Sequence, residues 1–139
     1  PTPDFVIAIM HYIDEHYRED IKMTSLAKQF SFSYGYMLRA FKDHTHITIK
    51  EYLNNKRIKK ATGLLLHSKY TIKEIAIESG FPNTKSFHNT FKQYHGTTPN
   101  VFRNKFKNDS NCVNSVYIDA SSFAIDFSRA MFPSVLNCI

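Results

Sequence analysis

Residues 71–96 read TIKEIAIESGFPNTKSFHNTFKQYHG, and this stretch decides the fold. Thr71, followed three residues later by an acid, predicts the capped start of a short helix. Gly80 suits the left-handed turn that ends this helix. Asn83 is expected to cap a second helix that carries its phenylalanines inward and ends before Gly96. Two short helices joined by a tight turn are typical of a helix-turn-helix unit.

The same pattern occurs about fifty residues earlier in the chain. A short helix over 23–30 is followed by an interruption, and Ser33 is expected to cap a helix that runs to about His44. We expect Tyr36, Met37, Ala40 and Phe41 to form its apolar face. The spacing between matching residues differs by one, which predicts a looser second turn. The matching pairs are Leu26-Ala27 with Ile75-Ala76, and Phe41-Lys42 with Phe91-Lys92.

A long helix is predicted between the two units, from about 48 to 67. Thr48 and Glu51 form a capping-box pattern at its start. Gly63 lies inside it, at a cost of about 1 kcal/mol relative to Ala, and we attribute it to close helix packing. Its basic residues predict either a solvated outer face or a patch that faces DNA or a polymerase, with Arg57 alternatively tied to an acid in the core. These residues are Lys56, Arg57, Lys59 and Lys60.

The periodicity therefore predicts an all-α fold of two helix-turn-helix subdomains joined by a long linker helix. Another amphipathic helix is predicted from about Asp4 to Tyr17, with Asp4 as its N-cap. We assign residues 1–107 to one double helix-turn-helix body, with a first unit at about 4–47 and a second at about 71–106. Residues 108–139 are expected to be a linker or tail, or the truncated start of another domain, and 112–118 alternates loosely like a strand.

Composition restricts the class of partner. Residues 1–107 carry 17 of the 18 basic residues and 9 of the 12 acidic residues, which suits nucleic acid, an anionic membrane surface or an acidic partner. No apolar run approaches the roughly 20 residues of a membrane span, and Pro1–Asp4 does not resemble a signal peptide. The start at Pro1 suggests part of a longer protein. Cys112 and Cys138 cannot form a disulfide framework, so a reducing compartment is expected.

No pattern in the chain indicates an enzyme, a metal site or a cofactor. There is no Gly-rich phosphate loop and no Ser-His-Asp arrangement. Asp14 and Glu15 point in different directions on a helix and make a poor catalytic pair. His44 and His46 are two residues apart, which favours surface or capping roles over metal binding.

Several motifs together resemble the AraC/XylS transcriptional regulators. In the first half these are Leu26-Ala27, Tyr36-Met37, Arg39, Phe41-Lys42, Tyr52-Leu53-Asn54, Arg57-Ile58 and Lys60-Ala61. In the second half they are Gly80-Phe81, Phe87, Phe91-Lys92, Gly96, Thr98-Pro99 and Phe102-Arg103. The resemblance covers about 4–106 and implies a seven-helix domain that binds double-stranded promoter DNA in the bacterial cytoplasm. It also implies RNA polymerase as a partner, and an effector or dimerisation domain elsewhere in a longer chain.

The resemblance assigns candidate DNA contacts. The base-facing positions of the first recognition helix (33–44) are Tyr34, Gly35, Leu38 and Arg39, and those of the second (83–95) are Thr84, Lys85, His88 and Asn89. Backbone contacts are expected from Thr24, Ser33, Lys42, Asn83, Lys85 and Lys92. The family often has Arg where Asn89 stands, which suggests a shifted base preference. It often has Gly where His46 stands, so the position at which the first recognition helix ends stays open.

The length of the linker helix predicts how the two recognition helices read DNA. Twenty helical residues span about 30 Å, close to the roughly 34 Å between successive major grooves on one side of the duplex. One chain is therefore expected to read an asymmetric site.

Two alternatives stay open: a DNA-repair or other multidomain protein that uses this fold as an appendage, and a helical protein-interaction module. The DNA-repair protein would need a reactive Cys outside residues 1–107. The protein-interaction module would not need the excess of basic over acidic residues.

Overall fold

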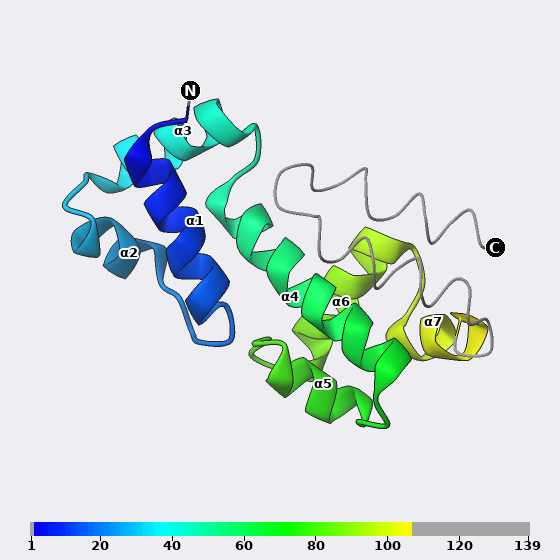
Figure 1. The fold of residues 1–139 in the computed structure, drawn as a ribbon. Helices are drawn as coiled ribbons and strands as arrows, with labels where there is room; N and C mark the ends of the chain where they lie inside the picture. Colours follow the sequence, from blue (N-terminus) through cyan, green and yellow to red (C-terminus); the bar gives the residue numbers. More distant parts are fainter. Residues whose placement is uncertain (1, 107–139) are drawn as a thin grey trace. The chain divides into compact units, whose positions relative to one another are not determined.

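The computed structural model describes residues 2–106, which contain seven helices and no strand (Figure 1). The predicted all-α fold is therefore confirmed for this part of the chain. The helices are α1 (Asp4–His16), α2 (Met23–Gln29), α3 (Tyr34–Thr45), α4 (Ile49–His67), α5 (Ile72–Glu78), α6 (Thr84–His95) and α7 (Pro99–Phe106). The chain divides between Lys56 and Arg57 into two compact units, here called the N-terminal unit and the C-terminal unit.

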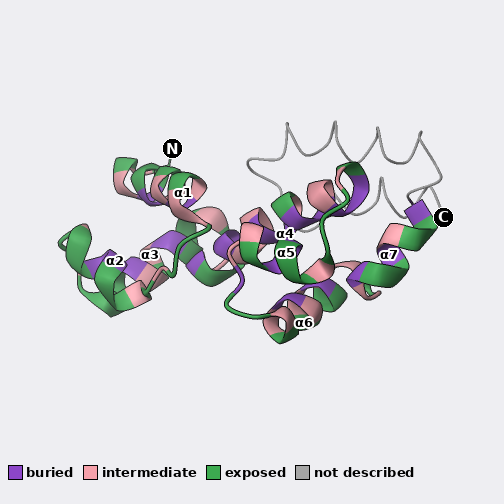
Figure 2. Ribbon diagram, turned by 90° about the horizontal axis from the view of Figure 1, so that it is seen from below, coloured by how far each residue is buried: buried purple, intermediate pink, exposed green. Residues whose placement is uncertain are grey.

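In the N-terminal unit, α1 and α2 both pack against α3. Apolar side chains at helical spacing turn inward from each helix, and Figure 2 shows them as buried segments beside exposed ones. Burying such side chains supplies most of the stability of a small domain. The core residues of this unit are Val6, Ile9, Ile13, Leu26, Ala27, Met37, Phe41, Ile49, Tyr52 and Leu53.

The central helix α4 contributes to both units. Its start is a capping box, as predicted: the Thr48 N–H donates to Glu51 Oε2 at 2.7 Å, and the Glu51 N–H donates to Thr48 Oγ1 at 3.0 Å. Ile49, Tyr52 and Leu53 belong to the core of the N-terminal unit. The second half of α4 opens the C-terminal unit, where it supplies the buried Ile58, Ala61, Thr62, Leu65 and Leu66.

The C-terminal unit is built around a cluster of phenylalanines. Phe81, Phe87, Phe91, Phe102 and Phe106 are all buried, and α6 packs against both α5 and α7. Aromatic edges meet aromatic faces in this cluster, which is a favourable arrangement of ring quadrupoles. The other members are Ile58, Ala61, Leu65, Leu66, Ile75 and Ala76, with Leu64, Ile72 and Tyr94 partly buried against them.

The two units are structural repeats of one pattern. Helices α3 and α6 both have 12 residues and begin fifty positions apart. Phe41 meets Tyr52 edge to face with centroids 6.0 Å apart, and Phe91 meets Phe102 in the same way at 5.3 Å. The internal duplication inferred from sequence therefore extends to the helix that follows each recognition helix.

The turns inside the two units differ by one residue, as the spacing predicted. In each, a residue with positive φ follows the first helix: Ser31 at 60° and Gly80 at 92°. The next N–H bonds back in the same way, Phe32 to Ala27 O at 3.0 Å and Phe81 to Ala76 O at 2.9 Å. The extra residue of the second turn is inserted after this shared bend, immediately before the cap of α6.

Three predictions from the sequence are wrong. Asp4 is not the N-cap of α1, because Pro3 occupies that position and Asp4 is the first helical residue. Tyr36 does not face the core, since it is 46% exposed. A Cβ added at Gly63 would have no atom of the described residues within 4 Å, so close packing does not explain this glycine.

The predicted basic outer face of the linker helix is also largely wrong. Arg57 is buried, and its guanidinium lies 6.0 Å from the centroid of the Phe81 ring. Lys56 is paired with Asp14, Lys59 is half-buried, and only Lys60 of the four is exposed. Two of the four side chains are therefore held against other parts of the chain, Lys56 by its ion pair with Asp14 and Arg57 by burial beside Phe81. The strand expected at 112–118 and the two cysteines lie outside the described residues.

Candidate nucleic-acid interface

Helices α3 and α6 each present one face that is not used for packing. In α3 the buried Met37 and Phe41 fix which side turns inward, and in α6 Phe87 and Phe91 do the same. At 100° per residue, positions one, two, five, six and nine of each helix fall on one arc of about 140°, which begins next to the buried positions four and eight and reaches the opposite side at position six. These positions contain all seven predicted base-reading residues: Tyr34, Leu38, Arg39, Thr84, Lys85, His88 and Asn89.

The outward face of α3 is aromatic and apolar with one guanidinium. Tyr34 is 47% exposed, Arg39 is exposed and Leu38 is half-buried. An added Cβ at Gly35 would lie 3.9 Å from a terminal nitrogen of Arg39, so the Arg39 side chain extends back along the helix toward its N-terminus. Because Gly35 has no side chain, the Arg39 guanidinium can lie close to the helix backbone at this position.

The outward face of α6 is polar throughout. Lys85 and Asn89 are exposed, whereas Thr84 and His88 are half-buried. The His88 ring is tied to its own helix, with Nδ1 3.0 Å from the carbonyl oxygen of Thr84. In the sequence, only the four-residue spacing between the two residues indicates this contact.

The predicted backbone-contact residues lie at helix starts and on the same faces. Ser33 and Asn83 are N-caps, as predicted: Ser33 Oγ accepts from the Tyr36 N–H at 3.4 Å, and Asn83 Oδ1 accepts from the Ser86 N–H at 2.7 Å. Lys42 and Lys92 are exposed at equivalent positions of α3 and α6, and Thr24 is exposed in the first turn of α2. The charge of these faces suits an anion, since α6 contains no acidic residue and α3 contains only Asp43.

The C-terminal ends of α3 and α6 are closed by left-handed residues. Gly96 ends α6 at φ 76°, and His46 ends α3 at φ 66°. The Gly96 N–H donates to Lys92 O and the His46 N–H donates to Lys42 O, both at 2.7 Å. The departure from glycine at His46 therefore does not change where α3 ends, although a side chain in this conformation is strained.

His95 holds the end of α6 to the linker helix. Its Nε2 lies 3.2 Å from Thr62 Oγ1, and its ring lies tilted against Phe91 and Phe102 at centroid distances of 4.4 and 4.8 Å. The half-buried imidazole is surrounded by aromatic rings and a hydroxyl. Loss of hydration lowers the pKa of His95 to about 3, so the ring is neutral at pH 7.

Asp14 connects α1 to the linker helix in the N-terminal unit, a role that the sequence did not reveal. The Tyr52 hydroxyl donates to Asp14 Oδ1 at 2.8 Å, and Lys56 Nζ lies 3.1 Å from the same oxygen. Burial, followed by the hydrogen bond to Asp14, raises the pKa of Tyr52 well above its ordinary value. Asp14, which the sequence analysis rejected as half of a catalytic pair, therefore has a structural contact.

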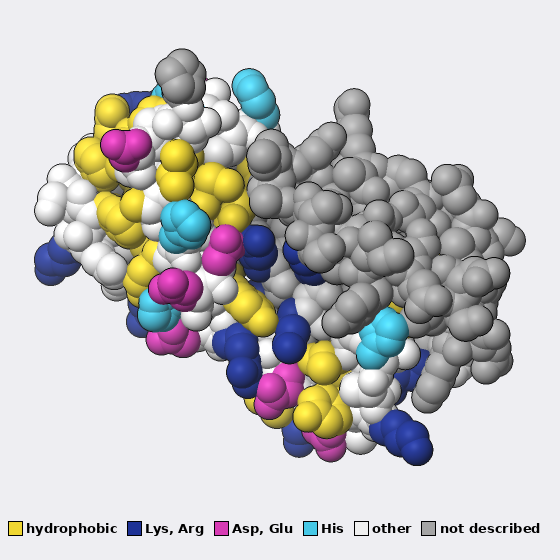
Figure 3. All heavy atoms as spheres, in the orientation of Figure 1, with side chains coloured by type: hydrophobic (Ala, Val, Ile, Leu, Met, Phe, Trp, Pro, Cys, Tyr) yellow, Lys and Arg dark blue, Asp and Glu magenta, His cyan; other side chains and the backbone are white. Residues whose placement is uncertain are grey.

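Aromatic side chains also gather where α1 meets the turn before α3. Phe5, Phe32 and Tyr36 lie with centroids between 4.8 and 6.0 Å apart. Figure 3 shows hydrophobic side chains over α1 on the face in view, and Ile7 of this helix is 41% exposed. This contact accounts for the outward position of Tyr36.

No three His, Cys, Asp or Glu side chains among residues 2–106 are placed to hold a metal ion. No helix of the described chain is long and apolar enough to span a membrane.

Comparisons with known proteins agree with a helix-turn-helix fold. The family described as "Helix-turn-helix domain" matches residues 26–105. The chain is 31% identical over 108 residues to the Msm operon regulatory protein of Streptococcus mutans, covering 78% of this chain and 39% of that protein. It is 35% identical over 95 residues to the transcriptional activator RhaS of Salmonella schwarzengrund, covering 68% and 34%.

A solved structure shares the fold. It is the C-terminal domain of AraT, a response regulator from Geobacillus stearothermophilus, with a TM-score of 0.72 and 30% identity over 75% of this chain and 87% of that chain. The chain spans between a third and two fifths of the length of the two regulators that it matches.

Proposed function

Because the chain belongs to the AraC/XylS-type helix-turn-helix family, we propose that it binds double-stranded DNA sequence-specifically and thereby regulates transcription from bacterial promoters. The observation that carries the proposal is the repeated unit itself. Each unit contains a 12-residue recognition helix with an outward face, which carries Tyr34 and Arg39 near the N-terminal end of α3 and Lys85 and Asn89 near that of α6. That end of a recognition helix is the part that contacts base edges in helix-turn-helix proteins.

The two helices suit different bases. Tyr34 and Leu38 offer apolar contact to thymine methyl groups, and Arg39 can pair with guanine. On α6, Lys85 can donate to guanine, and Asn89 can form two hydrogen bonds with adenine. Lys42, Lys92 and the capped helix starts at Ser33 and Asn83 would hold phosphates, which sets the register without reading sequence.

One chain is proposed to place the two recognition helices in successive major grooves. The 19 residues of α4 form one continuous helix, about 28 Å long at 1.5 Å per residue. That length is comparable with the spacing of grooves on one side of the duplex. The chain would then read an asymmetric site without a two-fold partner.

The remaining parts of the proposal concern partners. RNA polymerase and an effector or dimerisation domain elsewhere in a longer chain would complete a regulator, and the chain itself would act in the cytoplasm as a DNA-binding module rather than as an enzyme. The matched regulators are about twice as long as this chain, which supports a further domain.

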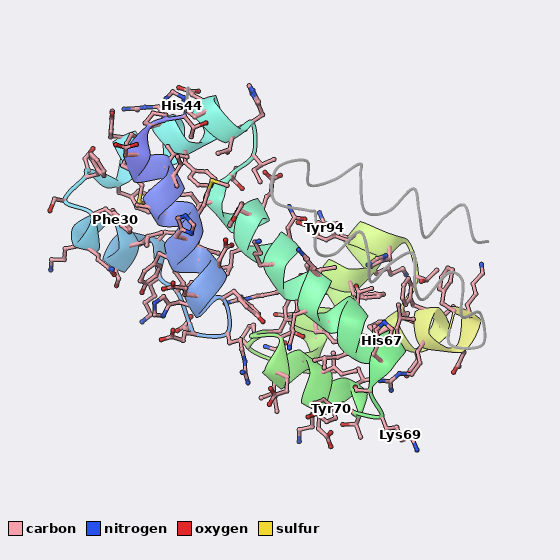
Figure 4. All side chains as sticks on the ribbon, viewed as in Figure 1. Phe30, His44, His67, Lys69, Tyr70 and Tyr94 are labelled. Carbon is pink, nitrogen blue, oxygen red and sulfur yellow. The ribbon has the colours of Figure 1, made fainter. Side chains whose placement is uncertain are left out.

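Alanine variants on the outward faces test the proposal. Lys85→Ala and Asn89→Ala should each cost about 1–3 kcal/mol on the preferred duplex and relax the preference at one position. Lys42→Ala should weaken all duplexes alike and reduce the salt dependence by about one counterion. Lys69→Ala is a charge-matched control, because it also removes one lysine but lies in the loop between α4 and α5, outside both recognition helices (Figure 4). Equal losses for Lys85→Ala and Lys69→Ala on specific and random DNA would refute the assignment.

A further inference from the structure

The half-buried His88 has a fixed ring orientation on the outward face of α6. Its Nδ1 lies 3.0 Å from the Thr84 carbonyl oxygen, one helical turn back. A carbonyl oxygen has lone pairs only and accepts hydrogen bonds, so Nδ1 must be the donor and must carry a proton.

This contact determines what the rest of the ring can do. A neutral imidazole has a single N–H, and when that proton is on Nδ1, Nε2 is a bare acceptor. Nε2 is also the ring nitrogen farther from Cβ, so it extends beyond the helix backbone to which Nδ1 is bound. In free neutral histidine the proton can occupy either nitrogen, whereas the Thr84 carbonyl selects one form.

The neighbours of His88 on α6 differ in chemistry. Lys85 presents only donors and Asn89 presents both a donor and an acceptor, so both can bind bases rich in acceptors. His88 lies between these two residues along the same face and, with Nδ1 occupied, offers only an acceptor. Lys85 and His88 therefore require opposite groups on the bases that they meet, an acceptor for Lys85 and a donor for His88.

We propose that His88 is a specificity-determining residue that selects a base presenting an amino group in the major groove. Only the N6 amino group of adenine and the N4 amino group of cytosine are donors there, whereas guanine and thymine present acceptors. The inference rests on the proposed function, and adds that the Thr84 carbonyl sets the polarity of one reading position. Guanine or thymine at that position would place an acceptor atom against the lone pair of Nε2, which is unfavourable.

The tautomer can be measured on the free 139-residue chain, independently of DNA. Long-range ¹H–¹⁵N correlation spectra at pH 8, where an ordinary imidazole is neutral, distinguish the two forms. We expect the Nδ1–H form to dominate for His88, with the exposed His44 of α3 as the reference for a ring in solvent (Figure 4). Dominance of the Nε2–H form at His88 would overturn the inference and leave the proposed function intact.

Base selection on duplexes tests the consequence. The wild-type chain should prefer adenine or cytosine about tenfold at one position, His88→Ala should lose that preference, and His88→Lys, which can only donate, should transfer it to guanine. A guanine or thymine preference that disappears in His88→Ala would refute the acceptor role. The acceptor role would also be refuted if His88→Ala selected the same DNA sequence as the wild type while Lys85→Ala and Asn89→Ala selected altered ones. Absence of any sequence preference in wild type and variants would instead refute the proposed function.

Discussion

The neutral His95 makes the stability of the C-terminal unit depend on pH. Its pKa is about 3 in the folded chain and about 6.5 in an unfolded one, so the unfolded state binds more protons between these values. Stability therefore rises with pH in this window and falls as the pH drops below about 6.5. From pH 7 to pH 5 the expected loss is about 2 kcal/mol, since the slope reaches about 1.4 kcal/mol per pH unit.

The variant His95→Gln isolates this contribution. Glutamine does not titrate, and its amide can still reach Thr62 Oγ1, which His95 contacts at 3.2 Å. Urea unfolding followed by far-UV circular dichroism at pH 7, 6 and 5 gives the free energy of unfolding for both proteins. The wild type should lose about 2 kcal/mol more than His95→Gln between pH 7 and pH 5. Parallel pH profiles for the two proteins would refute a neutral, desolvated His95.

Three further substitutions test the local physics by the same unfolding measurement. Gly63→Ala should stabilise the chain by about 1 kcal/mol, because the added Cβ meets no described atom within 4 Å; a loss would mean that the site is crowded. His46→Gly should stabilise by about 1 kcal/mol by removing a side chain from φ 66°, and no gain would show that His46 is unstrained. Thr71→Ala should cost about 1 kcal/mol through loss of the cap on the Glu74 N–H at 3.1 Å, whereas Thr71→Ser should not; equal losses would contradict a capping role.

The sequence predicted the helices well because their boundaries are local. Ser33, Thr48, Thr71 and Asn83 each bond an N–H within three residues, so a capping residue at the right spacing reveals a helix start. Helix ends are equally local where glycine provides positive φ, as at Gly96. Even the one-residue difference between the two turns follows from counting residues between matching pairs.

Contacts between helices could not be predicted in the same way. Asp14 and Tyr52 are 38 residues apart, and no spacing rule indicates that their oxygens meet at 2.8 Å. Arg57 belongs by composition to a basic stretch, yet its stem and guanidinium are buried beside Phe81. Long polar side chains with apolar stems are ambiguous in sequence, because packing decides on which side they lie.

In the candidate interface, too, the local features could be predicted from the sequence and the side-chain contacts could not. Helical periodicity placed Lys85 and Asn89 on the outward face, and both are exposed. The half-buried state of His88 depends on how its ring folds back to the Thr84 carbonyl, which periodicity does not specify. Which base each residue reads stays a prediction for the same reason, since side-chain polarity depends on contacts made within the protein.

Selection of binding sites from random duplexes at about 0.15 M salt tests the central claim most directly. The enriched duplex is then titrated against a scrambled one. Two-unit reading predicts an asymmetric site with two boxes about one helical turn apart, bound at least about a thousandfold more tightly than scrambled DNA. Equal affinity for the enriched and scrambled duplexes would contradict sequence-specific recognition by α3 and α6.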